Sequence, residues 1–399
     1  DDGQGRQDPQ VRPFSTSKMS PQMGESPPWR FLEFASVLRG LIVLLLLYMF
    51  LVGIGLLESG ITAMGEGFEE GLLESVSHPL SGLFAGILAT VLVQSSSVTT
   101  STIVGLVGAG TIPVPLAVPM IMGANIGTTV TNTLAALTTI LRSEEFRRGF
   151  ACATHHDFFN MLAVVILLPI ELATGLLTRG AEWLTVLVGR VDLEAAAPGR
   201  SPIRTAVNLP VDLIEGVIGT GLVAGVIYLV LGMAVLFFAL VFITRNMRQL
   251  LARGVEKALN QIIERGGAVL GIVAGILITV SVQSSSITTS ILVPLVASGV
   301  LNLTNAYPIT VGANVGTTVT ALIASLAVAL PGGLTIALVH LLFNLSAIAI
   351  IFPIRRIRMV PIVLSEHLAD LAVRRNSLVF TYVVGLFLVI PLLGMFLLQ

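Results

Sequence analysis

The sequence predicts an all-α polytopic membrane protein with two inverted-topology repeats, each containing a re-entrant helical hairpin and a broken helix. Of its 399 residues, 54% are hydrophobic and only 11% charged, with a mean hydropathy of +0.92, whereas a soluble domain carries about 25% charged residues. No Asp, Glu, Lys or Arg occurs in Ser75–Leu141 or Gly266–Ile354, runs of 67 and 89 residues. The same short sequence motifs occur in both runs. This composition excludes a soluble enzyme, and a net charge of −1 gives no reason to expect a nucleic-acid partner.

The apolar segments give seven candidate spans, because a helix needs about 20 apolar residues to cross a bilayer. Two further stretches, Leu83–Gly110 and Ala268–Leu301, are interrupted by the polar clusters Gln94–Ser97 and Gln283–Ser286. Polar backbone at membrane depth is tolerated only where it is buried in protein or lines a wet cavity. Both stretches are therefore predicted to be hairpins that enter the membrane and turn back. The candidate spans are Arg39–Leu57, Pro113–Leu141, Gly149–Leu177, Gly219–Ile243, Ala306–Leu330, Leu334–Ile354 and Ser377–Leu398.

The interrupted stretches belong to an internal duplication. Gln94–Thr131 aligns without a gap on Gln283–Thr320 at an offset of 189, and 21 of the 38 positions are identical. Chance does not produce such a match. The similarity resumes at a shift of 184, where His156, Phe159, Asn160 and Pro169 correspond to His340, Phe343, Asn344 and Pro353.

The distribution of basic residues predicts the orientation of the two halves, because Lys and Arg concentrate in cytoplasmic loops. Basic clusters at 142–148, 245–265 and 355–358 are predicted to be cytoplasmic, and the acidic segment Glu58–Pro79 external. The two halves then have opposite orientations, and inverted repeats with discontinuous helices indicate a transporter with a central site. The predicted organisation is a disordered cytoplasmic tail over 1–38, a first repeat over 39–177, an external loop over 178–218, a second repeat over 219–354, and a cytoplasmic connector with a C-terminal helix over 355–399.

The paired Gln-Ser-Ser-Ser clusters favour a site for a tetrahedral oxyanion. If the second arm of each hairpin begins there, its first N–H groups lack intrahelical partners and carry the positive end of the helix dipole. Small serines also let an anion approach the backbone. Alternatively, Ser and Thr serve as small packing residues between membrane helices, although their recurrence at equivalent positions favours a site. The candidate anion ligands are Ser95, Ser96, Ser97, Thr99, Ser284, Ser285 and Ser286.

A second repeated element, Gly123–Thr131 and Gly312–Thr320, is predicted to be an unwound turn in each half. Its carbonyl, hydroxyl and amide oxygens suit a monovalent cation, and the prolines that precede each copy are consistent with broken helices. The alternative is close helix packing through the glycines. Amide oxygens for such a cation come from Asn125 and Asn314, and from Gln94 in the first cluster.

Asp157 is the third candidate, because it lies about two turns inside a predicted span. An ionisable residue at that depth costs several kcal/mol unless it is paired or binds an ion, so a functional role is the default interpretation. Asp157 and Asn160 share a helix face, and the second half has Leu341 where Asp157 sits. An added cation site in one half would explain this difference. The alternative is a helix-end acid paired with Arg147 or Arg148.

The paired QSSS runs, the paired GANxGTTVT runs and the stretch FRRGFACATHHDFFNMLAVVILLPIELATG resemble the type II sodium-dependent phosphate cotransporter family. The resemblance covers about Leu83–Leu177 and Gly219–Pro353. It implies uptake of inorganic phosphate by alternating access, with sodium ions as co-substrate and no other cofactor. It implies phosphate contacts at Ser97, Ser284 and Ser285. Animal members have Thr where this chain has Val98, so one hydroxyl contact is missing or moved to Thr99. The implied sodium ligands are Gln283, Ser284, Thr128, Thr317 and Thr320.

The same resemblance implies electrogenic transport. Electrogenic members are similar to this chain at Ala151, Ala153 and Asp157, which implies an extra sodium ion at Asp157, near Asn160, and three sodium ions per divalent phosphate. The short, cysteine-free segment Thr178–Gly216 and short tails suggest a bacterial relative in the inner (plasma) membrane. Because members of the family are often dimers, the resemblance also leaves a homodimer in the lipid bilayer open. Three alternatives stay open: coupling to protons, transport of another oxyanion such as sulfate or arsenate, and a phosphate sensor that does not transport. No triad, metal cluster or nucleotide loop predicts an enzyme.

Overall fold

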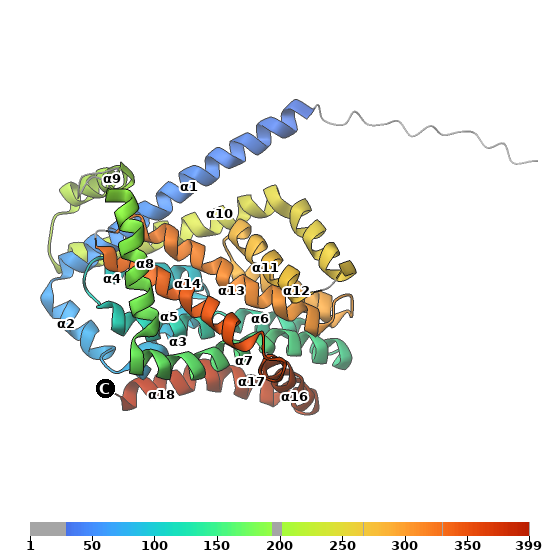
Figure 1. Ribbon diagram of the computed structural model, residues 1–399. Coiled ribbons are helices and arrows are strands. Elements are labelled where there is room, and N and C mark those ends of the chain that lie inside the picture. Colours follow the sequence, from blue (N-terminus) through green and yellow to red (C-terminus); the bar gives the residue numbers. More distant parts are fainter. Residues whose placement is uncertain (1–28, 194–201, 266, 329, 399) are drawn as a thin grey trace, which may run out of the picture.

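The computed structural model describes residues 29–193, 202–265, 267–328 and 330–398, and every secondary-structure element in these residues is a helix (Figure 1). In this part of the chain, six helices are long and apolar enough to cross a membrane. The chain is therefore an all-α, multi-pass membrane protein, as its composition predicts. The six spans are Val37–Met64, Val114–Thr139, Ser143–Thr174, Leu222–Met247, Pro331–Ile351 and Ser377–Leu397.

The long helices extend beyond the predicted spans. Residues 1–28 of the predicted tail lie outside the described residues, but 29–38 belong to the first helix rather than to a tail. This helix, α1, crosses α10 closely, since a Cβ at Gly60 would lie 2.8 Å from the Leu229 nitrogen. Small residues permit such crossings between membrane helices. The long elements are α1 (Trp29–Met64), α7 (Ser143–Thr174), α10 (Leu222–Arg265), α13 (Leu303–Ser325) and α14 (Pro331–Ile351).

The two interrupted stretches are helical hairpins, as predicted. The arms of the first hairpin are α3 (Pro79–Val93) and α4 (Ser96–Gly108), and those of the second are α11 (Ala268–Val282) and α12 (Ser285–Ala297). At the sequence offset of 189, the ends of α3 and α11 correspond, and so do both ends of α4 and α12. The duplication is therefore visible in the backbone, while the inverted orientation of the halves stays a prediction.

The helix that follows each hairpin differs between the halves. In the first half, α5 (Val114–Gly127) ends before two threonines and α6 (Val130–Ala136) continues into η1 (Leu137–Thr139). In the second half, α13 is continuous, so the predicted break there is wrong. The stretch Ala306–Leu330 contains α13, which is rich in Thr and Asn and is not among the six apolar helices, so a seventh span there stays a prediction.

The glycines that begin the second repeated element serve close helix packing, and the predicted interruption occurs only in the first copy, at Thr128 and Thr129. A Cβ at Gly123 would lie 2.0 Å from the carbonyl oxygen of Leu83, and a Cβ at Gly312 would lie 2.1 Å from that of Ile272. The backbones of α3 and α5, and of α11 and α13, therefore touch at equivalent points. Only glycine fits there, so the alternative interpretation of these residues is the better one.

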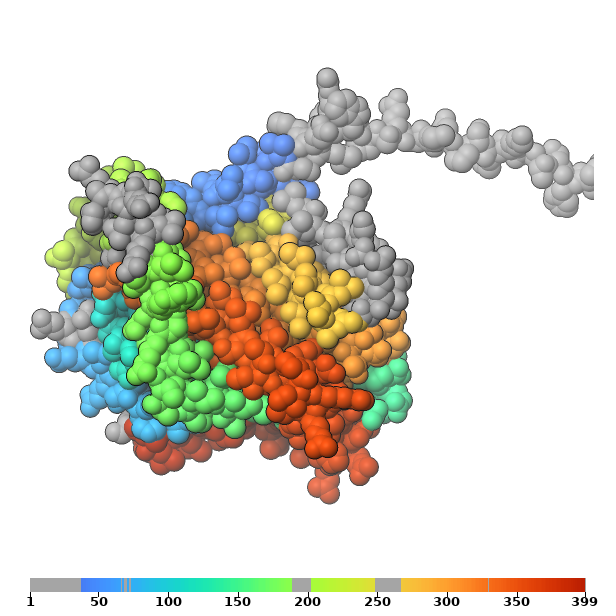
Figure 2. All heavy atoms as spheres, in the orientation of Figure 1, coloured from blue at the N-terminus to red at the C-terminus, as the bar shows by residue number. Residues whose placement is uncertain are grey.

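Figure 1 shows α2 (Glu66–Ser75) and α9 (Pro202–Ile218) at one end of the molecule, and α16 (Val360–Arg374) with the last turns of α10 at the other. The acidic and basic segments of the sequence thus lie at opposite ends, and their assignment to membrane sides stays a prediction. The predicted external loop is largely helical in its described residues, which form most of α8 (Leu176–Leu193) and all of α9. Helix α8 packs on α14 (Figure 2). The C-terminal elements are α15 (Arg355–Arg358), α16, α17 (Ser377–Val384), the π-helix η2 (Gly385–Val389) and α18 (Ile390–Leu397).

Candidate functional site

The tips of the two hairpins have the same backbone conformation. Gln94 and Gln283 lie in the left-handed region at φ 57° and 56°, and they are the only described non-glycine residues with positive φ. Ser95 and Ser284 follow in extended conformation and cap the second arms by accepting hydrogen bonds from Val98 N and Ile287 N. A non-glycine residue in the left-handed region costs about 1–2 kcal/mol. Such strain occurs preferentially at functional sites, so its presence at both tips indicates a site.

The glutamine side chains fix each tip to the helix that follows its hairpin. Gln94 Oε1 accepts a hydrogen bond from Thr131 Oγ1 at 3.2 Å, and Gln283 Oε1 accepts one from Thr320 Oγ1 at 2.9 Å. Each Nε2 donates to a carbonyl at the end of its own first arm. The structure thus brings Gln283 and Thr320 together, two of the predicted sodium ligands, and pairs Gln94 with a residue that was not predicted.

Four serine hydroxyls at the tips have no hydrogen-bond partner in the described chain. These belong to Ser96 and Ser97 on the first tip and to Ser285 and Ser286 on the second; all but the half-buried Ser286 are buried. They lie in the first turns of α4 and α12, where backbone N–H groups also lack intrahelical acceptors. Hydroxyls and N–H groups at a helix N-terminus suit an anion. Thr99 is different, because its hydroxyl donates to the Ser95 carbonyl at 3.2 Å.

The second tip is joined to the first half of the chain. Thr289 Oγ1 and Ser290 Oγ both donate to Asn132 Oδ1 in α6, at 2.9 and 3.2 Å. Beside this contact lies an open pocket of 430 Å³, whose lining includes Thr131 and Ser286. The second tip and the broken helix of the first half therefore border one cavity.

A buried chain of amides connects the two halves. Asn160 Nδ2 donates to the carbonyl oxygen of Asn125 at 2.6 Å, and Asn160 Oδ1 accepts from Asn314 Nδ2 at 2.7 Å. Asn314 Oδ1 lies 2.6 Å from His156 Nε2, which completes the chain. This network brings together three predicted cation ligands. The equivalent Asn344 of the second half lacks such a network, since its Oδ1 has no partner and its Nδ2 donates only within α14, to the His340 carbonyl at 3.0 Å.

Asp157 is fully buried, with 0% of its surface exposed. Its Oδ2 accepts a hydrogen bond from the hydroxyl of Tyr382 at 2.6 Å, and its Oδ1 has no partner. None of the ion pairs among the described residues includes it. Arg147 instead pairs with Asp370, and this guanidinium holds the pKa of the Asp370 carboxyl below its usual range. The alternative pairing of Asp157 with Arg147 is therefore wrong, and the pairing with Arg148 finds no support either.

Other predicted cation ligands turn toward their own helices. Asn125 Nδ2 donates to Ile121 O at 3.0 Å. The hydroxyls of Thr128 and Thr317 donate to carbonyls one turn earlier, at 2.9 and 3.1 Å. The structure thus does not gather all the predicted cation ligands into one cluster. In the described residues no group of three or more His, Cys, Asp or Glu side chains could hold a metal ion.

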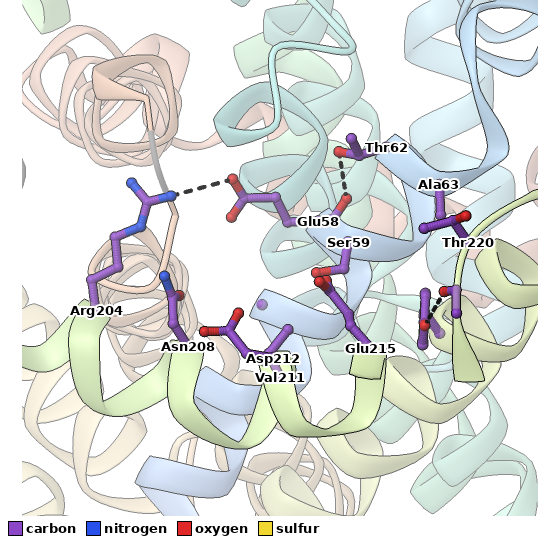
Figure 3. Close-up of a pocket in the computed structure, with 13 residues that line it drawn as sticks. Glu58, Ser59, Thr62, Ala63, Arg204, Asn208, Val211, Asp212, Glu215 and Thr220 are labelled. Carbon is purple, nitrogen blue, oxygen red and sulfur yellow. Dashed lines mark hydrogen bonds and ion pairs between the residues drawn. The ribbon is translucent and has the colours of Figure 1, made fainter. Parts of the chain in front are cut away.

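A separate pocket of 450 Å³ lies between α1 and α9 and contains none of the predicted ligands (Figure 3). Glu58 of α1 pairs with Arg204 of α9 at 3.9 Å, and Asp212 and Glu215 line the same side. Spacings of three and four residues place these polar side chains on one face of α9. Its opposite face is apolar and exposed, as at Leu209 and Leu213. The helix α9 is therefore amphipathic, with its polar face lining the pocket. The pocket is no part of the candidate site.

Three residues with contacts at the site were not among the predicted ligands. Asn132 is polar where the second half has Ala321, the same kind of difference between repeats that singled out Asp157, so a systematic comparison would have found it. His156, which the sequence marks only as the counterpart of His340, joins the amide chain. Tyr382 carries no signal of this kind, because it lies outside the duplication.

The fold and the tips together define a multi-pass membrane protein with duplicated helical hairpins and polar tips, an architecture typical of secondary transporters. The chain belongs to the Na+/Pi-cotransporter family, which it matches over residues 49–176 and 235–365.

The chain is also similar to several mammalian proteins. It is 32% identical over 431 residues to sodium-dependent phosphate transport protein 2A of Ovis aries, covering 89% of this chain and 67% of that protein. It is 31% identical over 449 residues to sodium-dependent phosphate transport protein 2B of Homo sapiens, covering 90% and 65%. The chain thus spans about two thirds of the length of these relatives. No solved structure matches the chain.

Proposed function

We propose that this chain is a secondary active transporter that couples the uptake of inorganic phosphate to sodium. The observation that carries the proposal is the pair of equivalent tips, each with two unpartnered serine hydroxyls beside a helix N-terminus. The names of the relatives support sodium and phosphate as the transported ions. Coupling to a sodium gradient allows phosphate to accumulate without any chemical reaction at the site.

In this proposal, phosphate lies between the two tips as the divalent ion. Ser95 and Ser284 shape the tips as caps, while the neighbouring hydroxyls and N–H groups provide hydrogen bonds to the oxyanion. No Lys or Arg occurs in either charge-free run, so bound sodium supplies much of the compensating charge. The proposed phosphate ligands are Ser95, Ser96, Ser97, Thr99, Ser284, Ser285 and Ser286.

One proposed sodium site uses Asp157 with Asn160 nearby. Three sodium ions with a divalent phosphate carry one net positive charge inward, and each charge contributes about 2.3 kcal/mol per 100 mV of membrane potential. The unpartnered Oδ1 of Asp157 supports this site, because a buried carboxylate oxygen without a donor is costly unless a cation binds it. The other proposed ligands are Gln94, Gln283, Ser284, Asn125, Thr128, Asn314, Thr317 and Thr320.

The test is uptake of labelled phosphate into proteoliposomes at a clamped voltage. We expect accumulation that requires an inward sodium gradient, stops when choline replaces sodium, and increases with an inside-negative potential. Uptake driven by a proton gradient alone would mean that protons, not sodium ions, are the coupling ions. Stronger competition by sulfate or arsenate than by unlabelled phosphate would identify that oxyanion, rather than phosphate, as the preferred substrate. Phosphate binding in detergent without accumulation would instead identify a sensor.

The substitution Asp157→Gly tests the electrogenic step. We expect it to abolish the phosphate-induced current while sodium-driven uptake stays measurable, because only the extra cation is lost. Glu171→Gln is the matched control, since it neutralises another buried acid of α7 whose carboxylate accepts hydrogen bonds from Leu177 N and Thr178 N. An unchanged current in the Asp157 variant contradicts the assigned role.

A further inference from the structure

We infer that Tyr382, on the C-terminal helix α17, is a positioning residue for the cation site at Asp157; the inference rests on the proposed function. The Tyr382 hydroxyl donates a hydrogen bond to Asp157 Oδ2 at 2.6 Å. The other carboxylate oxygen, Oδ1, is buried and has no hydrogen-bond partner, since the nearby Thr129 hydroxyl donates to the Ile126 carbonyl at 2.8 Å. One oxygen is therefore held by a donor and the other is left for the cation.

The chemistry of the donor suits this role. A phenol hydroxyl is neutral, so it orients the carboxylate and leaves its negative charge available, whereas a paired arginine would neutralise it. Arg147 lies on the same helix as Asp157 but is engaged by Asp370. Asp157 thus keeps an uncompensated carboxylate in a fully buried position. Such a group is costly in an apolar interior unless a cation binds it.

The ring of Tyr382 is held in place by three phenylalanine rings. Its centroid lies 6.4 Å from Phe150, 6.4 Å from Phe158 and 6.1 Å from Phe387, with edge-on or tilted geometry. Aromatic pairs at these separations contribute about 0.5–1.5 kcal/mol each beyond burial. Because two of these rings lie on α7 with Asp157, the hydroxyl is fixed relative to the carboxylate. The contact is therefore a built feature of the α7–α17 interface.

The segment that carries Tyr382 stands apart from the duplication. The family match ends at residue 365, and no repeat copy corresponds to α17. Directly after this helix the backbone forms the π-helix Gly385–Val389, and single π-turns inside helices occur frequently at functional sites. Phe387 of this π-helix packs edge-on to Tyr382. Asp157 likewise has no acidic counterpart in the second half. The hydrogen bond therefore joins two features that each occur once in the chain, the acid and the helix α17.

The experiment compares Tyr382→Phe with Tyr228→Phe in the full chain. Both changes remove one hydroxyl that donates a hydrogen bond, since Tyr228 of α10 donates to the carbonyl of Gly219, between α9 and α10. For Tyr382→Phe we expect the half-saturating sodium concentration of phosphate uptake to rise about tenfold, equivalent to about 1.4 kcal/mol. The maximal rate at saturating sodium stays within about twofold of wild type. Tyr228→Phe leaves the half-saturating concentration unchanged.

Two further readouts separate positioning from a purely structural role. Added to Asp157→Gly, the Tyr382→Phe change has no further effect on sodium dependence if the hydroxyl acts through the carboxylate. An additional loss of equal size in that background would overturn the inference. The rise in thermal unfolding midpoint that sodium produces in detergent is also smaller in Tyr382→Phe than in Tyr228→Phe.

The outcomes distinguish this inference from the proposed function. If the wild type transports phosphate and Tyr382→Phe keeps the wild-type sodium dependence, the positioning role is overturned and the function stands. If the wild type does not transport but sodium stabilises it in a Tyr382-dependent manner, the function is overturned and the positioning role is supported. Without transport, equal sodium stabilisation in both variants overturns both.

Discussion

At the tips of the two hairpins the backbone adopts the same conformation, yet their second arms are held by different polar contacts. In the second hairpin, the hydroxyl of Thr279 donates to that of Thr288 at 2.9 Å, and Thr289 reaches across to Asn132. In the first hairpin, the hydroxyls of Thr90 and Ser101, which correspond to Thr279 and Ser290, have no partner, and those of Thr99 and Thr100 donate only to carbonyls of their own segment. The arm α12 is thus tied by side chains to its neighbours, and α4 is held by apolar packing.

This difference teaches that the duplication preserved the backbone while polar side chains diverged. The close glycine contacts recur in both halves at almost equal distances. The amide chain through Asn314 and the acid at Asp157 occur once. We therefore expect substitutions of the shared backbone contacts to be equally damaging in both halves. Substitutions of the diverged side chains should affect one half more than the other.

The largest effect is expected for Gly123→Ala and Gly312→Ala. Each Cβ would lie within 2.1 Å of a backbone carbonyl oxygen on the neighbouring helix, which forces two closely packed helices apart. Overpacking costs about 1–3 kcal/mol and sometimes more, and backbone cannot yield as a side chain does. Both variants should lose most of their folded protein, as measured by size-exclusion chromatography in detergent.

The control for the glycine pair is Gly105→Ala, whose Cβ would have its nearest neighbour at 4.0 Å. This variant should elute like the wild type. If Gly123→Ala or Gly312→Ala is tolerated while its counterpart is not, the two helix contacts are not equivalent in the membrane, and the shared backbone is no basis for comparing the halves.

Much of the architecture is predictable because it depends on composition and on the repeat. Charge-free runs identify membrane segments, and the polar clusters locate the hairpin turns within a residue or two. The break after α5 is a different case. Gly127–Thr131 and Gly316–Thr320 are identical, yet only the first copy is interrupted. Local sequence cannot explain this difference, and the bonds from α12 to Asn132 exist only beside the interrupted copy.

The site is predictable only in part, for the same reason. The serines at the tips were identified from their recurrence, and the structure leaves four of their hydroxyls unbonded. The partner of Asp157 could not be identified, because Tyr382 is 225 residues away in sequence and a tyrosine in an apolar span is an ordinary observation. Contacts between distant segments depend on tertiary packing, which neither periodicity nor spacing records.

A smaller effect is expected for Asn314→Leu, which sharpens the comparison at the centre of the molecule. This change removes two hydrogen bonds and leaves polar atoms of Asn160 and His156 buried without partners. Each such atom costs about 1–3 kcal/mol, so the variant should be destabilised by about 3 kcal/mol. The repeat-equivalent Asn125→Leu should cost about 1 kcal/mol, because that side chain bonds only within its own helix.

Thermal unfolding in sodium-free detergent measures both asparagine variants without a contribution from bound cation. Asn314→Leu should lower the unfolding midpoint by clearly more than Asn125→Leu. Equal shifts would mean that the single amide chain does not distinguish the halves energetically.

The smallest effect concerns the arms themselves, through Thr289→Val and Thr100→Val. Valine keeps the shape of threonine but removes the hydroxyl, which lies 2.9 Å from both Asn132 Oδ1 and the Ser285 carbonyl oxygen. Thr289→Val therefore loses the contact between α12 and Asn132 at a cost of about 1 kcal/mol. Thr100 bonds only to a carbonyl of its own helix, at 3.4 Å, and its loss should cost less. Hydrogen–deuterium exchange reports local opening, and wild-type α12 should exchange more slowly than α4. Thr289→Val should speed exchange in α12 about fivefold, while Thr100→Val leaves α4 nearly unchanged. If α4 is the slower arm in the wild type, apolar packing outweighs the polar anchor and the comparison between the hairpins must be reversed.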